Sequence, residues 1–278
     1  MKLLATSVLV SLATASGAMA TTVVRTLDAS PTTAGVWANG FNTGSGTVGT
    51  VDLTGTGGDL EGNQPLPVGA LQFTTTFDNN DRANAVVQDD YGAPGDVFST
   101  LQISFDYHKA FVAGGNAFAA PSLKLAFFNG GPLDPSSAGD GYGQLIYEPT
   151  WNQPGNEGSS VAVPTDTWTS VSIDGDSGLF WWTGGFGQPN TAGGPPLRTL
   201  NEWLSAFNSN SLDFSSSTLF EVGFGVGSFN QGQLGYVDNV SIRHDGYSAS
   251  YDFEPVPTPT AALAGLVGLG LVALRRRA

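Results

Sequence analysis

The sequence predicts an all-β protein, folded as an antiparallel β-sandwich of two sheets, and three observations lead to this prediction. Apolar and polar residues alternate with a period of two along most of the chain, which is typical of strands that bury one face. Gly, Pro, Asn or Asp separates nearly all of these segments, as short turns require. No strand–helix–strand rhythm appears, so a parallel α/β sheet is not expected.

The alternating segments are the predicted strands. The clearest ones place apolar side chains on a single face, and they are Leu71–Phe77, Leu101–Tyr107, Leu123–Phe127, Val171–Ile173, Phe220–Val226 and Leu234–Ile242. Weaker candidates have shorter patterns, and they are Val23–Leu27, Val48–Leu53, Ala85–Gln88, Gln144–Glu148, Leu179–Thr183 and Tyr247–Phe253. In the segment that begins at Phe220, strict alternation places Phe220 on the same face as Val222 and Phe224.

One short helix interrupts this pattern. Thr199 and Glu202 form a capping box, in which each side chain satisfies a backbone N–H of the first turn. Apolar residues then follow at helical spacing, and Trp203 among them is expected to pack in the core. Asn208-Ser209-Asn210 ends the pattern, so the helix is expected to cover one edge or end of the sandwich.

An acid falls on the apolar face of the last long strand. Strict alternation puts Asp238 on the face of Tyr236 and Val240, which predicts a buried carboxyl group. Such a group must be hydrogen-bonded or coordinate a cation, unless a bulge turns it outward. A hydrogen-bonded structural role is the interpretation we favour.

Both ends of the chain look like targeting segments, which direct export and sorting of a protein. Met1-Lys2, an apolar stretch from Leu3 to Leu12, and the A-x-A pattern of Ala18 and Ala20 predict a signal peptide over residues 1–20. The Sec machinery and signal peptidase are the partners that this segment implies. Glu254–Thr260 is a Pro/Thr linker, and Ala261–Leu274 is an unbroken apolar run that covers only about 21 Å as a helix.

A bilayer core is about 30 Å thick, so this run is short for a permanent span but long enough to hold the chain transiently. A basic cluster that should stay on the cytoplasmic side follows it, Arg275, Arg276 and Arg277. The predicted organisation is therefore a signal peptide (1–20), a β-sandwich domain (21–253), a linker (254–260) and a C-terminal hydrophobic sorting segment (261–278).

The tail resembles a PEP-CTERM sorting signal, a bacterial element that begins Val-Pro-Glu-Pro, continues as one hydrophobic segment and ends in arginines. The matching residues are Val256, Pro257, Thr258, Pro259, Arg275, Arg276 and Arg277. Thr258 departs from the pattern, because the family usually has Glu there. The resemblance implies processing by an exosortase, a membrane transpeptidase of Gram-negative bacteria that make exopolysaccharide, and delivery to the cell surface or extracellular matrix. A permanent membrane anchor is the alternative.

Composition limits the partners of the body. Residues 21–254 hold six of the ten basic residues and all 24 acidic ones, a net charge of −18. Nucleic acids and anionic lipids are not expected as partners, because both need clustered Lys and Arg. The chain has no cysteine, so the exported domain must be held together by core packing rather than by disulfides.

The segment Gly235–Ile242, a last long strand that contains Asp-Asn-Val, is similar to the jelly-roll domains of bacterial surface proteins. Lectin-like and carbohydrate-binding modules are among these domains. The resemblance implies a jelly-roll-like arrangement and says little about activity.

Catalytic motifs are missing. No H-E-x-x-H or G-x-S-x-G pattern occurs, and the carboxylates are too scattered to single out a glycosidase pair. We therefore predict a non-enzymatic surface or matrix protein with a structural or adhesive role that binds polysaccharide. An extracellular carbohydrate-active enzyme of unrecognised type is the alternative, and two carboxylates facing each other in a concave groove would favour it.

Two acidic turns are candidate calcium sites. They place oxygen ligands close together at Asp78 and Asp81, and at Asp174 and Asp176. Asx-turn chemistry explains both turns equally well.

Aromatic residues are the candidate glycan contacts, and they are Trp151, Trp181, Trp182 and Phe186. Trp181 and Trp182 are adjacent in one strand, so they must point to opposite faces. If the later strands run simply up and down, the loops 108–121, 149–167 and 184–218 leave from one end of the sandwich. They would gather Trp151 and Phe186 there with Phe111 and Phe118. Packing of these aromatics beneath their own loops is the alternative.

Overall fold

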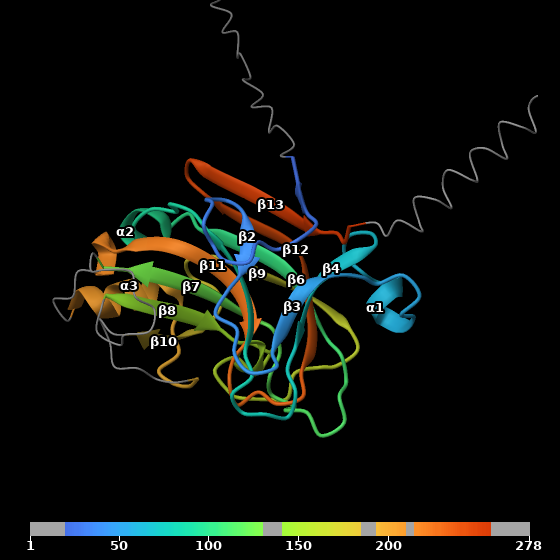
Figure 1. Ribbon diagram of the computed structural model, residues 1–278. Helices are drawn as coiled ribbons and strands as arrows, with labels where there is room; N and C mark the ends of the chain where they lie inside the picture. Colours follow the sequence, from blue (N-terminus) through green and yellow to red (C-terminus); the bar gives the residue numbers. More distant parts are fainter. Residues whose placement is uncertain (1–19, 130–140, 185–192, 210–213, 257–278) are drawn as a thin grey trace, which may run out of the picture.

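The computed structural model describes residues 20–129, 141–184, 193–209 and 214–256, and it shows two β-sheets packed face to face (Figure 1). This confirms the predicted sandwich. All paired strands are antiparallel except β1 (Thr22–Val24) and β13 (Tyr247–Phe253), which pair in parallel. The predicted signal peptide (1–20), apart from Ala20, and the tail from Pro257 onward lie outside the described residues.

The seven-stranded sheet is organised around β12 (Leu234–His244). On one edge of β12 lies β6 (Gln102–Lys109), which also pairs with β9 (Trp168–Ile173). The other edge is shared, because β4 (Gly69–Thr74) pairs with the first half of β12 and β13 with the second. The remaining strand, β3 (Thr47–Asp52), pairs with β4.

The six-stranded sheet has the order β10-β8-β7-β11-β5-β2. The bounds of its strands are β2 (Trp37–Asn39), β5 (Ala83–Gln88), β7 (Ser122–Phe128), β8 (Tyr142–Tyr147), β10 (Phe180–Gly184) and β11 (Thr218–Val226). The chain crosses between the two sheets several times, as in a jelly roll. Of these strands, β2 has no counterpart in the sequence prediction.

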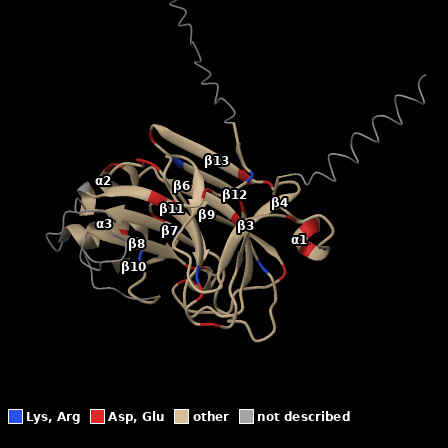
Figure 2. Ribbon diagram, viewed as in Figure 1, with Lys and Arg blue, Asp and Glu red and all other residues tan. Residues whose placement is uncertain are grey.

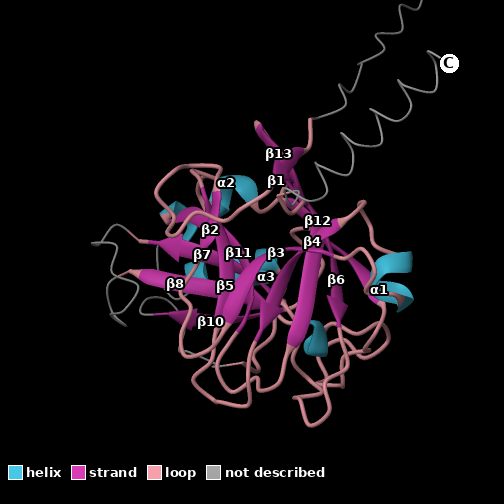
Figure 3. Cartoon of the chain, turned by 45° about the vertical axis from the view of Figure 1, so that its right-hand side comes forward, coloured by secondary structure: helices cyan, strands magenta, loops and turns pink. Residues whose placement is uncertain are grey.

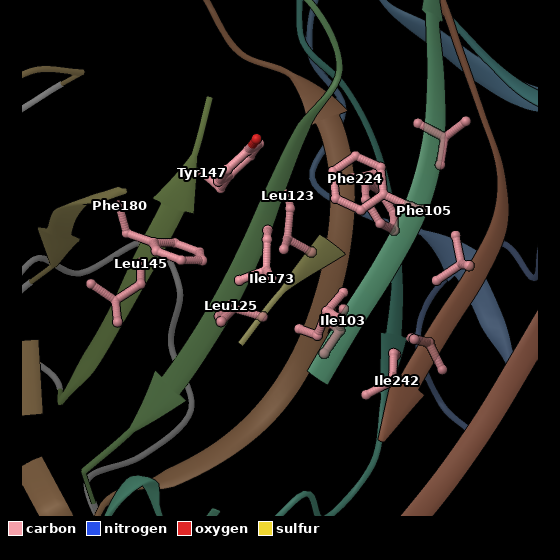
Figure 4. Close-up of a cluster of buried hydrophobic side chains, with 14 of the residues drawn as sticks. Ile103, Phe105, Leu123, Leu125, Leu145, Tyr147, Ile173, Phe180, Phe224 and Ile242 are labelled. Atoms are coloured by element: carbon pink, nitrogen blue, oxygen red, sulfur yellow. The ribbon is translucent and has the colours of Figure 1, made fainter. Parts of the chain in front are cut away.

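The core lies between the sheets and consists of the inward alternates of their strands. Ile103 and Phe105 of β6 face Leu123 and Leu125 of β7 and Phe224 of β11 (Figure 4). All five side chains are at most 1 % exposed. The period-two pattern therefore identified the buried face of most strands, and its burial provides the main stabilisation.

The predicted helix is α3 (Leu200–Ser209), and its capping box is present: the Thr199 N–H donates to Glu202 at 2.9 Å. Trp203 is fully buried and donates its indole N–H to the Phe180 carbonyl at 2.9 Å. The prediction of a single helix was incomplete, because short helical turns also occur elsewhere (Figure 3). These are α1 (Gly58–Gly62), α2 (Pro94–Val97) and the 3-10 turns η1 (Pro149–Trp151) and η2 (Phe214–Ser216).

The predicted face of Phe220 was wrong. A β-bulge between Leu219 and Glu221 shifts the register of β11 against β7, so that Leu219 is buried in the core together with Val222 and Phe224. Phe220 and Glu221 consequently lie on the outer face of the sheet. One extra residue in a strand turns every side chain before it to the other face of the sheet, and a simple alternating pattern does not reveal this.

A second irregularity decides the environment of Asp238. Asn239 has a positive φ of 52°, and the pairing of β12 with β6 shifts between Asp238 and Ser241. Val237 and Val240 therefore both face the core, whereas Tyr236 packs on the outer face. Asp238 is completely buried, as predicted, and its Oδ1 accepts a hydrogen bond, whereas its Oδ2 has no hydrogen-bond partner among the described residues.

The prediction that three long loops leave from one end was wrong for 184–218. Because β10 is antiparallel to β8, Gly184 lies beside Gly143 at the start of β8. The chain therefore leaves β10 at the opposite end from the loop that follows β8. Simple up-and-down order fails because the chain visits the other sheet, at β9, between β8 and β10.

Acidic residues outnumber basic ones, and Figure 2 shows fewer basic than acidic positions along the ribbon. The two ends of the described body lie side by side, since Thr22 of β1 is paired with Tyr251 of β13. The described body therefore begins and ends at one edge of the seven-stranded sheet. Within the described ranges, no helix has the length and apolar character needed to cross a membrane.

Candidate functional site

A groove of about 1240 Å³ covers the outer face of the six-stranded sheet. Its floor consists of the outward alternates of the strands, whose inward alternates form the core. Its walls come from the loops around β2, from the segment before β7, and from the segment after β8. The floor residues used below are Asn84, Gln88, Lys124, Gln144, Glu148, Trp181, Phe220 and Glu221.

The strand register arranges the floor in rows. One row contains Trp181, Ile146, Lys124, Gly223 and Val86, from β10 across to β5. Five neighbouring strands span four steps of about 4.8 Å, so a row is roughly 19 Å long. The groove therefore crosses the strands and has room for an extended ligand rather than for one small ring.

The next row is more polar. It contains Thr183, Gln144, Ala126, Glu221 and Gln88. Gln88 donates to the Glu221 carboxylate at 2.8 Å across β5 and β11. Burial raises the pKa of Glu221, while the hydrogen bond from Gln88 and the charge of Lys124 oppose that shift.

Lys124 crosses the middle of the floor. Its ammonium group donates to Asn84, although β11 lies between their strands. The stem of Lys124 can cross there because β11 presents Gly223 and Gly225 to the groove. A Cβ on Gly225 would lie 2.4 Å from the Asn84 amide oxygen, so a larger residue would displace this contact.

Lys124 titrates at an unusually low pH. Burial lowers its pKa to about 8, and the nearby positive charge of Arg82 acts in the same direction. The carboxylates of Glu148 and Glu221 oppose this shift. Lys124 is therefore a cation at neutral pH, and its protonation is sensitive to what occupies the groove.

Glu148 lies at the β8 end of the floor. Its carboxylate accepts a hydrogen bond from the Trp151 indole N–H at 3.2 Å. Burial raises the pKa of Glu148, and the indole groups of Trp181 and Trp151 partly offset this effect. The Trp181 N–H is near this carboxylate but makes no hydrogen bond of full geometry.

Aromatic rings line both the floor and the rim. Trp181 is 9 % exposed and belongs to the floor, whereas Trp151 is half-buried in a wall. Phe220 packs against Tyr142 with ring centroids 6.1 Å apart. Three phenylalanines on loops stand at the rim and are 48–69 % exposed, and they are Phe41, Phe118 and Phe229.

The structure places only some of the glycan contacts predicted from the sequence in the groove. Trp151 and Trp181 both line the groove. Trp182 does not, because it is fully buried in the core, where it packs against Phe207 at a centroid distance of 4.8 Å. The two tryptophans thus point to opposite faces, as predicted, while Phe186 lies outside the described residues.

Sequence reasoning missed most of the polar floor. Lys124, Glu148, Glu221 and Gln88 are the polar alternates of their strands, a pattern that ordinarily indicates a solvent-exposed face. One signal was available: the body has only six basic residues, and one of them lies within a strand between Leu123 and Leu125.

The first candidate calcium turn uses its carboxylates for local hydrogen bonds. Asp81 accepts from the backbone N–H groups of Ser45 and Thr76, both at 2.7 Å. Asp78 accepts from the backbone N–H of Asn80 at 2.8 Å. The Thr76 hydroxyl also donates to Asp81 at 2.6 Å, and this bond, followed by that from the Ser45 N–H, lowers the pKa of Asp81. Asp81 therefore links two loops, as Asx-turn chemistry allows.

The second candidate calcium turn is similar. Asp174 accepts from the backbone N–H of Asp176 at 2.9 Å, and Asp176 accepts from the Asn201 side chain at 2.7 Å. Among the described residues, no three His, Asp or Glu side chains are grouped closely enough to hold a metal ion.

Glu148 and Glu221 are the two carboxylates of the groove floor. The register places them two strands apart laterally and four residues apart along the strand direction. Their Cα atoms are therefore roughly 16 Å apart. Glycosidase carboxyl groups lie about 5–9 Å apart, so this pair would meet that spacing only if both side chains leaned toward each other across Lys124.

A smaller hollow of about 580 Å³ lies beside α3. It is lined by Leu197, Arg198, Asn201, Glu202 and Ser205. Because it offers no aromatic surface, and Glu202 is already used in the capping box, the larger groove is the stronger candidate site.

Comparisons with known proteins add likeness in shape only. No protein-family model matches the chain, and no curated protein matches it in sequence. A family 11 carbohydrate-binding module from Clostridium thermocellum, solved with a β-1,3-1,4-mixed-linked tetrasaccharide, is 15 % identical, with 84 % of this chain and 97 % of the module covered and a TM-score of 0.37. An endo-β-1,4-glucuronan lyase from the fungus Trichoderma reesei is 13 % identical, with 76 % and 95 % covered and a TM-score of 0.36. Likenesses this distant assign no function to this chain.

Proposed function

We propose that this protein is an exported polysaccharide-binding protein, and that the groove on the six-stranded sheet holds a glycan chain across the strands. The observation that supports this most directly is the composition of the groove. A long trough combines the aromatic surfaces of Trp181 and Trp151 with amide, carboxylate and ammonium groups on adjacent strands. A sugar chain needs both kinds of contact, because each ring has apolar C–H faces and a polar rim of hydroxyl groups.

The floor is preorganised for such a ligand. Gln88 and Glu221 hold each other, and Trp151 holds Glu148, so these acceptors and donors are already oriented before a ligand arrives. Gln88 and Glu221 are carried on paired strands, and Glu148 and Trp151 lie at the end of β8 and in the turn η1 that follows it. Preorganisation of this kind reduces the entropy that binding would otherwise cost.

Export and surface delivery belong to the same proposal. Residues 1–20 act as the signal peptide, and the tail from Val256 to Ala278 acts as a PEP-CTERM-like sorting signal read by an exosortase. The tail follows β13 at an edge of the seven-stranded sheet, whereas the groove is on the outer face of the other sheet. A protein attached through this edge would keep its groove free for matrix polysaccharide.

Affinity electrophoresis tests the binding proposal. Purified protein is run through gels that contain one polysaccharide each, covering neutral β-glucans, mannans and uronate polymers. We expect retardation by at least one of them, and we expect Trp181→Ala and Trp151→Ala to reduce it. Phe111→Ala is the matched control, because Phe111 is an equally aromatic, 68 % exposed loop residue that does not line the groove.

Two outcomes would contradict the proposal. Migration unchanged by every polysaccharide would remove the binding function. Sustained release of new reducing ends from a polysaccharide would replace it with an enzymatic one.

Intact-mass analysis of the protein recovered from cells and medium tests the proposed export and sorting. A product that retains both Met1 and Arg277 would exclude processing at either end.

A further inference from the structure

Positive charge is scarce in this protein, yet two basic residues face the same groove. The body carries a net charge of −18 and only six basic residues, which are Arg25, Arg82, Lys109, Lys124, Arg198 and Arg243. Arg82 and Lys124 both line the groove. Arg82 precedes Asn84, the hydrogen-bond partner of Lys124, by two residues, and its charge lowers the pKa of Lys124.

Neither cation forms a direct ion pair with a carboxylate in the part of the chain that the structure describes, although Glu148 and Glu221 lie near Lys124. The Lys124 ammonium group has three N–H donors and donates to the Asn84 amide oxygen. Arg82 donates to the Ser228 hydroxyl at 3.2 Å and lies over the Phe41 ring at 5.6 Å. Several N–H donors of both groups are therefore left for a ligand.

The carboxylates of the floor are engaged elsewhere. Glu148 accepts from Trp151, and Glu221 accepts from Gln88. Both lie diagonally from Lys124, one on each side, so they limit its desolvation cost without closing on it. Two like charges that share a partly buried site repel each other, and an anion bound between them would remove that repulsion.

We propose that the groove is selective for acidic glycans, and that Arg82 and Lys124 together bind the carboxylate of a uronic acid residue. This inference rests on the proposed glycan-binding function and names its substrate class. The guanidinium group of Arg82 can hold a carboxylate with two parallel hydrogen bonds, and Lys124 adds a point charge from the floor.

The aromatic contact completes the site. Trp181 lies in the same row as Lys124, two strands away, at a backbone distance of roughly 10 Å. The Lys124 ammonium group points away from Trp181, toward Asn84 of β5. A carboxylate held there therefore leaves a more distant part of an extended sugar chain to lie over the Trp181 ring. Glu148 and Glu221 then serve as acceptors for sugar hydroxyl groups on either side.

The experiment compares acidic and neutral polymers at equal length by isothermal titration calorimetry at low ionic strength. The acidic probes are oligogalacturonate, oligoguluronate and oligoglucuronate, and the neutral probes are cello- and mixed-linked gluco-oligosaccharides. We expect an acidic oligomer to bind about tenfold or more tightly than the neutral ones, as one charge-assisted contact implies. Lys124→Met and Arg82→Gln should each remove this preference.

A matched control separates site charge from net charge. Arg243→Gln makes the same change in net charge as Arg82→Gln, but Arg243 is an exposed residue of β12, in the other sheet. It should leave affinity unchanged. Lys124→Arg should keep the preference for the acidic probe, and thermal unfolding of each variant confirms that the fold is retained.

The outcomes separate this inference from the function on which it rests. Neutral oligomers that bind as tightly as acidic ones, or an acidic preference that survives in both Lys124→Met and Arg82→Gln, would overturn the inference and leave the glycan-binding function standing. A preference lost equally in Arg243→Gln would also overturn it, because net charge would explain the result. Failure of every oligomer and polymer to bind would overturn both.

Discussion

Asp238 accepts a hydrogen bond from the backbone N–H of Phe253 at 3.1 Å, at the point where the edge of β12 changes partner from β4 to β13. Two strands that lie end to end leave a gap in the ladder, and this buried carboxyl group bridges it. Gly69 opens the other side of the gap, because a Cβ there would lie 2.3 Å from the Phe253 carbonyl oxygen.

This arrangement predicts a pH-dependent stability. Burial raises the pKa of Asp238 to about 7, with Asp252 and Glu254 adding repulsion. A carboxyl group whose pKa is higher in the folded state contributes stability below its unfolded pKa near 4, and that contribution is lost as the pH rises to about 7. Three pKa units correspond to roughly 4 kcal/mol as an upper bound.

Asp238→Asn keeps an oxygen acceptor for Phe253 but cannot ionise. We expect the variant to be more stable than the wild type at pH 8 and about equal to it at pH 4.5. Urea unfolding at both pH values measures the difference. Stability differences that are the same at the two pH values would show that Asp238 does not titrate in this range.

His108 should make stability depend on pH in the opposite direction, so that stability is lost as the pH falls. It is 2 % exposed between Trp168 and Tyr236, and neither ring nitrogen has a hydrogen-bond partner among the described residues. Burial lowers its pKa, while the carboxylates of Asp59 and Asp166 partly oppose the shift. A histidine whose pKa is lower in the folded state contributes stability above its unfolded pKa near 6.5, and that contribution is lost as the pH falls.

His108→Leu removes this titration. We expect the wild type to lose stability relative to the variant between about pH 7 and pH 5. Thermal melting across that range is the measurement. Parallel pH profiles for the two proteins would mean that the protonated imidazole is accommodated without cost.

The adjacent tryptophans separate binding from stability. Trp182→Ala empties a core position and should cost about 3–5 kcal/mol of unfolding free energy. Trp181→Ala should cost less, because that ring faces the groove, but it should reduce polysaccharide retention. Chemical denaturation and affinity electrophoresis on both variants give the comparison. A folded Trp181→Ala protein that is still fully retained would contradict the assignment of this ring to the ligand.

Binding of an acidic glycan should depend on pH through Lys124. Its pKa of about 8 means that the free protein loses this positive charge as the pH rises through 8. We therefore expect affinity for a uronate oligomer to fall between about pH 7 and pH 9. In Lys124→Arg the decline should disappear, because arginine remains charged in this range. An equal decline in the two proteins would point to another titrating group.

Local sequence patterns predicted the sandwich and its core well, since burial on one face imposes the period of two that Ile103 and Phe105 display. They failed at the bulges near Phe220 and Asn239, because one extra residue changes the facing of a strand without changing its composition. The groove was only partly predictable. Trp151 and Trp181 could be selected because they are aromatic. That Lys124 and Glu221 lie in the groove follows only from the strand order, which depends on pairings between distant segments.

The most direct test of the glycan-binding groove is the set of six tryptophan indole N–H signals in a ¹H–¹⁵N spectrum recorded with and without a bound oligosaccharide. Only Trp151 and Trp181 line the groove, and the other four lie in the core or on the opposite sheet, namely Trp37, Trp168, Trp182 and Trp203. We expect the signals of Trp151 and Trp181 to shift on titration while those of the other four stay in place. Shifts confined to the other tryptophans, or no shift with any oligosaccharide, would contradict the account.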